Sequence, residues 1–153
     1  MWEEPCISGT NGSGTVFFSG CSLNCVYCQN YEISHKGKGE VISYERLAEI
    51  FKDLENKGAH NINLVTPTHY YSNLRRIFQE YRPNIPIVYN SSGYESIENI
   101  SEDIFDVYLF DMKYFSKEKS KRYSGTDNYF EIASKIIKKM SDIRANLAVW
   151  GTK

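Results

Sequence analysis

Long apolar stretches are missing from this sequence, and so is a positively charged leader. No apolar run approaches the ~20 residues that a helix needs to span a bilayer. The first residues, Met-Trp-Glu-Glu-Pro, are acidic and lack the apolar centre of a secretory signal. We therefore expect a cytoplasmic protein that works without a membrane partner.

A surplus of either charge is missing as well. The 153 residues carry 18 Lys and Arg against 19 Asp and Glu, which gives a net charge of −1. This balance gives no electrostatic reason to expect a nucleic-acid partner, and the interrupted basic run at 117–122 is typical of a solvated helix face. Because the sequence has no internal repeat and no low-complexity tract, its length predicts about one domain.

What the sequence does contain is a regular alternation of two kinds of segment. Short apolar runs at 16–18, 61–66, 85–89 and 106–112 are typical of strands. Between and after them, apolar residues recur at helical spacing: Leu47, Ile50, Phe51 and Leu54; Leu74, Ile77, Phe78 and Tyr81; a short stretch around Ile97 and Ile100; and Ile132, Ala133, Ile136, Ile137 and Met140. Ser43 and Gly58 are suited to begin and end the first of these helices, and Pro83 to end the second.

Such an alternation predicts an α/β fold with a parallel sheet and right-handed crossovers. About four βα units are present, whereas a complete eight-unit barrel takes ~250 residues, so we expect a partial, open parallel βα barrel. The apolar run 147–150 reads either as a fifth strand or as a frayed end.

Three of the four cysteines lie within eight residues, spaced Cys-x3-Cys-x2-Cys at Cys21, Cys25 and Cys28. They follow the first strand, which places them at the carboxyl mouth of a barrel, where active sites collect. Three thiolates can bind three irons of a [4Fe–4S] cluster and leave the fourth open to a small molecule. A zinc site completed by Cys6 or His35 is the main alternative, a disulfide is disfavoured in a reducing compartment, and Cys6 otherwise reads as a buried or free thiol.

Tyr27, just before the last cysteine, completes a loop that resembles the motif of the radical S-adenosylmethionine (SAM) superfamily. The segments 2–9, 12–20, 61–70 and 89–94 are similar to its pyruvate formate-lyase activating enzyme-like branch. The resemblance covers roughly 2–140 but not the tail 141–153, and it implies a single truncated domain over 1–153 with its cluster loop at 20–30. It also implies SAM bound to the open iron, reductive cleavage to a 5′-deoxyadenosyl radical, an electron donor such as flavodoxin or ferredoxin, and a protein substrate if the chain activates a glycyl-radical enzyme.

Polar residues follow each of the later strands, where a parallel sheet gathers its functional groups. They are Thr66, Thr68 and His69; Asn90, Ser91 and Ser92; and Asp111 and Lys113. The resemblance matches 90–92 and 111–113 to positions that contact SAM or a bound cation, and it suggests that Lys113 pairs with the SAM carboxylate. We add Tyr27, Thr66 and Thr68 as further candidates for cofactor binding. Thr66 and Ser92 read equally well as helix caps, and Asp111 as the start of a helix.

The end of the second strand departs from the family pattern. Many radical SAM proteins have Gly-Gly-Glu-Pro at this point, whereas residues 65–68 here are Val-Thr-Pro-Thr and carry no carboxylate. The sequence identifies no residue that acts on a substrate. Three hypotheses remain: a SAM-cleaving enzyme, an inactive fragment that still binds an iron–sulfur cluster, and a zinc-binding interaction module.

Overall fold

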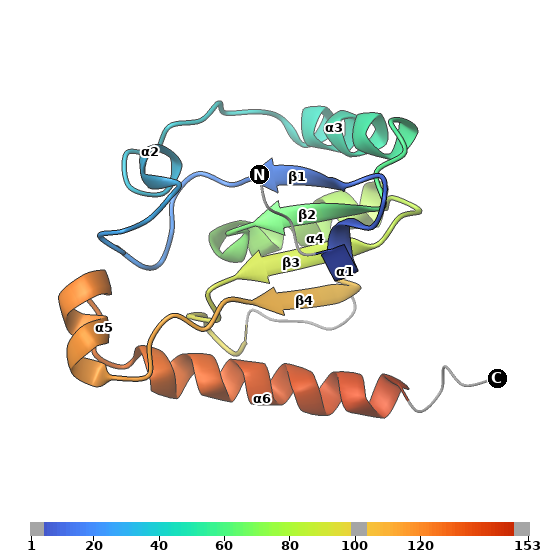
Figure 1. Ribbon diagram of the computed structural model, residues 1–153. Helices are drawn as coiled ribbons and strands as arrows, with labels where there is room; N and C mark the ends of the chain where they lie inside the picture. The colour runs from blue at the N-terminus through green and yellow to red at the C-terminus, as the bar shows by residue number, and fades with distance from the viewer. Residues whose placement is uncertain (1–4, 99–103, 149–153) are drawn as a thin grey trace.

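A computed structural model describes residues 5–98 and 104–148. Its centre is one parallel sheet in the order β1-β2-β3-β4, formed by β1 (Ser13–Phe17), β2 (Asn61–Val65), β3 (Ile87–Ser91) and β4 (Val107–Phe110). The four arrows in Figure 1 all point toward the side on which the cysteine loop lies. This arrangement confirms the α/β class and the partial, open barrel.

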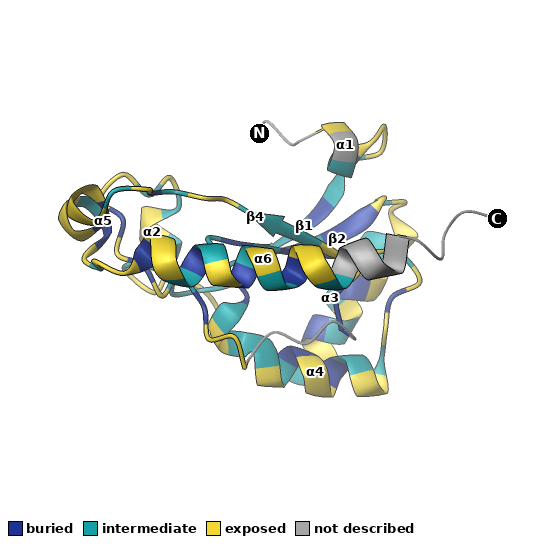
Figure 2. Ribbon diagram, turned by 90° about the horizontal axis from the view of Figure 1, so that it is seen from below, coloured by how far each residue is buried: buried dark blue, intermediate teal, exposed yellow. Residues whose placement is uncertain are grey.

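The helices cover mainly one face of the sheet. They are α1 (Pro5–Ser8), α2 (Tyr31–Ser34), α3 (Tyr44–Asn56), the 3-10 helix η1 (Thr68–Tyr70), α4 (Tyr71–Glu80), α5 (Lys117–Ser124) and α6 (Tyr129–Ala148). As Figure 2 shows, α1 lies on the side of the sheet opposite to α3 and α4. The helix α6 passes along the β4 edge, where its buried Ile136 and Met140 pack against Tyr108 and Phe110. No helix in the described ranges is long and apolar enough to span a membrane.

The strand register explains the core. Leu64 lies between Val16 and Tyr89 on the face that α3 and α4 cover, and it is fully buried. Burying an apolar side chain of this size stabilises the fold by roughly 1.5–3 kcal/mol. The other face presents half-buried residues such as Asn63 and Asn90, and among the described elements α1 touches it, because Asn61 Nδ2 donates to the Ile7 carbonyl oxygen (2.7 Å). This second face corresponds to the interior of an open barrel.

The ends of α3 agree with the sequence prediction. Ser43 Oγ accepts from the Arg46 N–H (3.2 Å), and the chain leaves the helix through Gly58 at φ +79°, a conformation that costs glycine little. The helix α4 ends at Glu80, since Tyr81 is extended and Pro83 cannot continue a helix.

All four predicted strands had at least one boundary that was wrong, by one to three residues. β1 begins at Ser13; β3 begins at Ile87, because Pro86 has no N–H to give to the sheet. β4 spans only Val107–Phe110, since the Asp106 side chain itself accepts from the Ile87 N–H (2.8 Å).

Predictions for the connecting segments also need correction. Residues 97–98 form a turn rather than part of a helix, and Ile100 lies outside the described residues. The helix α6 continues to Ala148, so the start of the run 147–150 is helical, in keeping with the helix-forming Arg, Ala and Leu at 144–148; residues 149–150 lie outside the described ranges. Neither Thr66 nor Ser92 caps a described helix, and Asp111 precedes α5 by several residues.

Candidate functional site

The cysteine loop is held in place by contacts with distant parts of the chain. The backbone N–H groups of Asn24 and Val26 donate to the carbonyls of Ser124 (3.2 Å) and Tyr123 (2.9 Å) at the end of α5. Ser22 Oγ donates to the Tyr94 carbonyl oxygen in the loop after β3 (3.1 Å). The loop therefore has its shape set by both β3 and α5.

Where the loop leaves β1, the chain requires a glycine. Gly20 has φ +90°, and a Cβ atom at this position would lie 3.0 Å from His69 Nε2. That nitrogen donates to the Ser19 carbonyl oxygen (2.6 Å). The His69 side chain therefore links η1 to the start of the cysteine loop through this hydrogen bond.

Each of the three free thiols has a polar neighbour. The Leu23 N–H donates to Cys21 Sγ (3.4 Å), and the Tyr114 hydroxyl donates to Cys25 Sγ (3.4 Å). The Ser34 hydroxyl lies 3.2 Å from Cys28 Sγ and 2.7 Å from His35 Nδ1. Cys21 and Cys25 therefore each have a donor that can stabilise a thiolate, whereas the single Ser34 O–H near Cys28 donates to the Asn30 carbonyl oxygen (2.9 Å).

Cys25, Cys28 and Lys113 all lie close enough to Cys21 to change the pKa of its thiol. Burial raises the pKa of the Cys21 thiol above its usual value, and the Leu23 N–H opposes this rise. The nearby thiols of Cys25 and Cys28 raise it further, while the Lys113 ammonium lowers it. Ligation of a metal by the Cys21 sulfur therefore releases a proton.

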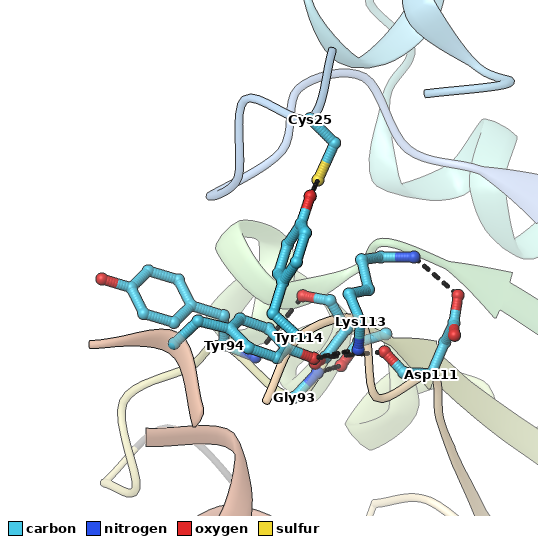
Figure 3. A network of polar contacts seen from close by, with 9 residues as sticks. Cys25, Gly93, Tyr94, Asp111, Lys113 and Tyr114 are labelled. Carbon is cyan, nitrogen blue, oxygen red and sulfur yellow. Dashed lines mark hydrogen bonds and ion pairs between the residues drawn. The ribbon is translucent and has the colours of Figure 1, made fainter. Parts of the chain in front are cut away.

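Lys113 stands beside this loop, beyond the end of β4. Its Nζ pairs with Asp111 Oδ2 (2.6 Å), as Figure 3 shows, and its side chain is only 26% exposed. Burial acts to lower the pKa of Lys113, but the Asp111 carboxylate raises it above its usual value, so the ammonium stays charged. Asp111 and Lys113 both lie past the end of β4, within reach of each other.

The ends of β3 and β4 are joined by Tyr129 from α6. Its hydroxyl accepts from the Lys113 N–H (2.9 Å) and donates to the Ser92 carbonyl oxygen (2.6 Å). The Tyr94 ring stacks on the Tyr129 ring with centroids 6.1 Å apart. A single buried phenol thus fixes the relative positions of two loops that the sequence assigns to cofactor binding.

A buried carboxylate, Glu95, ties β2 to β3. It accepts hydrogen bonds from the hydroxyls of Thr68 (3.1 Å), Tyr89 and Ser91. Burial raises the pKa of Glu95 above its usual value, and the three hydroxyls oppose the rise. Sequence reasoning missed this residue, which lies in the irregular segment after β3.

The remaining predicted site residues take varied positions. Thr66 has φ +57°, rare for a β-branched residue, and its N–H donates to the Asn90 carbonyl oxygen (2.9 Å). Asn90 lies on the opposite face from Ser91, whose Oγ is engaged by Glu95 and by the Gly93 N–H. Tyr27 is 53% exposed. Their roles in cofactor binding stay predictions.

The donor set distinguishes between the metals considered. Within the described ranges, no three His, Cys, Asp or Glu side chains converge on a point that would hold one metal ion. Structural zinc takes four ligands around one ion, whereas three thiolates can each bind a different iron of one four-iron cluster and leave the fourth iron open. His35 Nδ1 is turned to Ser34, and the Cys6 side chain lies outside what the structure describes. Three thiolates therefore fit a cluster better than zinc.

The three free cysteines therefore lie in a loop at the carboxyl end of a four-stranded parallel sheet. The sequence model of the radical SAM superfamily matches residues 15–149. The chain belongs to this superfamily.

Two curated relatives are similar to the chain over most of its length. An uncharacterized protein of Methanocaldococcus jannaschii is 33% identical over 131 residues, which cover 78% of this chain and 38% of the relative. A protein of Haemophilus influenzae named "Putative glycyl-radical enzyme activating enzyme" is 26% identical over 113 residues, or 70% of this chain and 43% of the relative. The chain thus spans about two fifths of the length of each.

Proposed function

We propose that this protein binds a [4Fe–4S] cluster through Cys21, Cys25 and Cys28, binds SAM at the open iron, and cleaves it reductively. The observation that carries the proposal is the set of three free thiols, each with a hydrogen-bonding neighbour, beside a charged lysine. Together, the cluster and SAM supply a 5′-deoxyadenosyl radical, which removes hydrogen from a substrate.

The protein's own residues bind and orient. Three thiolates would each hold one iron. The hydrogen bonds of the cysteine loop to α5 and to the segment after β3 fix the positions of these thiolates. Lys113 offers a charged ammonium beside Cys25 and Tyr27, which suits it to bind the SAM carboxylate. Asp111 holds this ammonium in place, and Glu95 holds the loop ends that carry Thr68 and Ser91.

For the substrate, we propose activation of a glycyl-radical enzyme, so a backbone glycine of a partner protein would lose the hydrogen atom. The name of the Haemophilus influenzae relative supports this class. A low-potential electron carrier of the flavodoxin or ferredoxin type, in a reducing cytoplasm, would supply the electron. Because the chain spans about two fifths of its relatives, the experiment must also separate turnover from cluster binding alone.

The test is anaerobic reconstitution followed by analysis of iron, sulfide and zinc. Comparable amounts of iron and sulfide support the cluster, and stoichiometric zinc would refute it. Incubation with SAM and dithionite should then yield 5′-deoxyadenosine. Iron and sulfide without 5′-deoxyadenosine would instead identify a cluster-binding protein that does not turn SAM over.

A further inference from the structure

The contact between Tyr114 and Cys25 is the most enclosed polar contact in the cysteine loop. Tyr114 is 7% exposed and Cys25 is 5% exposed. The phenol oxygen lies 3.4 Å from the sulfur, and Figure 3 shows the Tyr114 ring standing upright beneath Cys25 with its hydroxyl directed at Sγ. A hydrogen bond in such a dry place is stronger than one in water.

The Tyr114 ring has little freedom to turn away. It meets the Tyr129 ring edge to face at 5.3 Å and 90°, and the Tyr27 ring at 6.1 Å and 61°. The backbone just before it is fixed as well, because the Lys113 N–H donates to the Tyr129 hydroxyl. Packing, rather than the hydrogen bond itself, therefore sets the direction of the O–H group.

The other two sulfurs have different neighbours. Cys21 is served by a backbone N–H, which no side-chain substitution removes. The hydroxyl near Cys28 belongs to Ser34, which is shared with the Asn30 carbonyl oxygen (2.9 Å) and with His35. The Tyr114 hydroxyl is directed at its sulfur by a rigid ring, with the Tyr27 hydroxyl as its other polar neighbour, and a single substitution can remove it.

We propose that Tyr114 tunes the reduction potential of the cluster through the Cys25 sulfur; this inference rests on the proposed cluster. When one electron from a low-potential donor enters the cluster, its sulfurs become more negative, and the phenol O–H stabilises that charge. No bond breaks and the proton stays on the phenol oxygen. Hydrogen bonds to the sulfurs are a recognised means of setting cluster potentials.

The experiment is an anaerobic redox titration of the reconstituted protein without SAM, followed by electron paramagnetic resonance. Tyr114→Phe removes only the hydroxyl, so the equilibrium constant for reduction should fall about tenfold, which is about 59 mV for one electron. Tyr94→Phe is the matched control. It removes a phenol hydroxyl that bonds Thr126 and Asn128 instead of a sulfur, so the potential should stay at the wild-type value.

A second substitution should shift the reduction potential in the opposite direction. Tyr114→3-fluorotyrosine keeps the ring but has a more acidic hydroxyl, a stronger donor, so the potential should rise. This variant decides the matter if Tyr114→Phe fails to hold its cluster. Unchanged potentials in the loaded variants would overturn the tuning role while leaving the proposed function intact. A wild-type protein without iron and sulfide would overturn the proposed function, and the tuning role with it.

Discussion

Glu95 should be the most consequential carboxylate for folding stability. Glu95→Ala removes the acceptor of three hydroxyls in a place that is 8% exposed. In this variant the Tyr89 hydroxyl can still donate to Thr68 Oγ1 (3.3 Å). The hydroxyls of Thr68 and Ser91 are therefore the donors that lose their acceptor. A buried donor without an acceptor costs about 1–3 kcal/mol, so we expect a loss of about 3 kcal/mol in the free energy of unfolding.

That loss corresponds to a fall in melting temperature of about 6–12 °C for a domain of this size. Urea unfolding followed by circular dichroism would measure the free energy directly. A loss below about 1 kcal/mol, the average for any substitution, would show that the carboxylate is not holding these hydroxyls.

The pH dependence gives an independent check with a definite sign. Burial raises the pKa of Glu95 in the folded state above 4.5, so between the unfolded and folded pKa values the folded protein binds more protons than the unfolded chain. The Glu95 contribution to stability is therefore complete below pH 4.5 and is lost as the pH rises through the folded pKa. Across that window the free energy of unfolding should fall by about 1.4 kcal/mol for each pH unit. Glu95→Gln should abolish this decline.

Glu55 supplies the matched control at the other end of the sheet. Its carboxylate also accepts three hydrogen bonds, from the Asn84 side chain and backbone and from the Tyr81 hydroxyl. These bonds lower the pKa of Glu55, so its contribution is present above pH 4.5 and is lost as the pH falls through the folded pKa. Glu55→Gln should therefore change the pH curve with the opposite sign; parallel curves for both variants would refute the reasoning.

Four further predictions concern the metal loop, the backbone and the sheet edge. Replacing Cys21, Cys25 or Cys28 by Ala should abolish iron retention, whereas Cys6→Ala should keep it; equal loss in Cys6→Ala would indicate a four-ligand site. Thr66→Gly should raise the free energy of unfolding by about 1 kcal/mol, because φ +57° strains a β-branched residue, and an unchanged urea midpoint would contradict this. Gly93→Ala should lower that free energy by about 1–3 kcal/mol, since φ is +72° and the new Cβ would lie 3.4 Å from Ala133 Cβ, which thermal melting would test. β4 is the last strand of the described sheet, so the chain should self-associate in light scattering; a monodisperse, cooperatively melting monomer would mean that this edge is protected.

The part of the site that could be predicted from the sequence depends on parallel strands. Once strands are placed, their carboxyl ends must meet at one edge, which is why Lys113 is expected near Cys25 although 88 residues separate them. The apolar periodicity similarly predicts the covered faces of α3 and α4, because burial requires it.

Two residues of the site escaped prediction for a shared reason. Glu95 reaches its three hydroxyls from an irregular loop, and Tyr114 reaches Cys25 after the chain has turned beyond β4. Irregular backbone has no periodicity, so side-chain direction there follows from tertiary contacts alone. Local propensity also misleads at Thr66, where a β-branched residue adopts a left-handed conformation that its own preferences oppose.

The hydrogen bonds that join the cysteine loop to α5 have a consequence for the order of assembly. The backbone N–H groups of Asn24 and Val26 donate to carbonyl oxygens of residues 123–124, about one hundred positions later in the chain. A nascent chain therefore exposes all three thiols well before it can complete their binding loop. Contacts of such long range form late in folding because of their loop-closure entropy. For the proposed cluster, we expect iron and sulfide to enter only after α5 has docked against the cysteine loop.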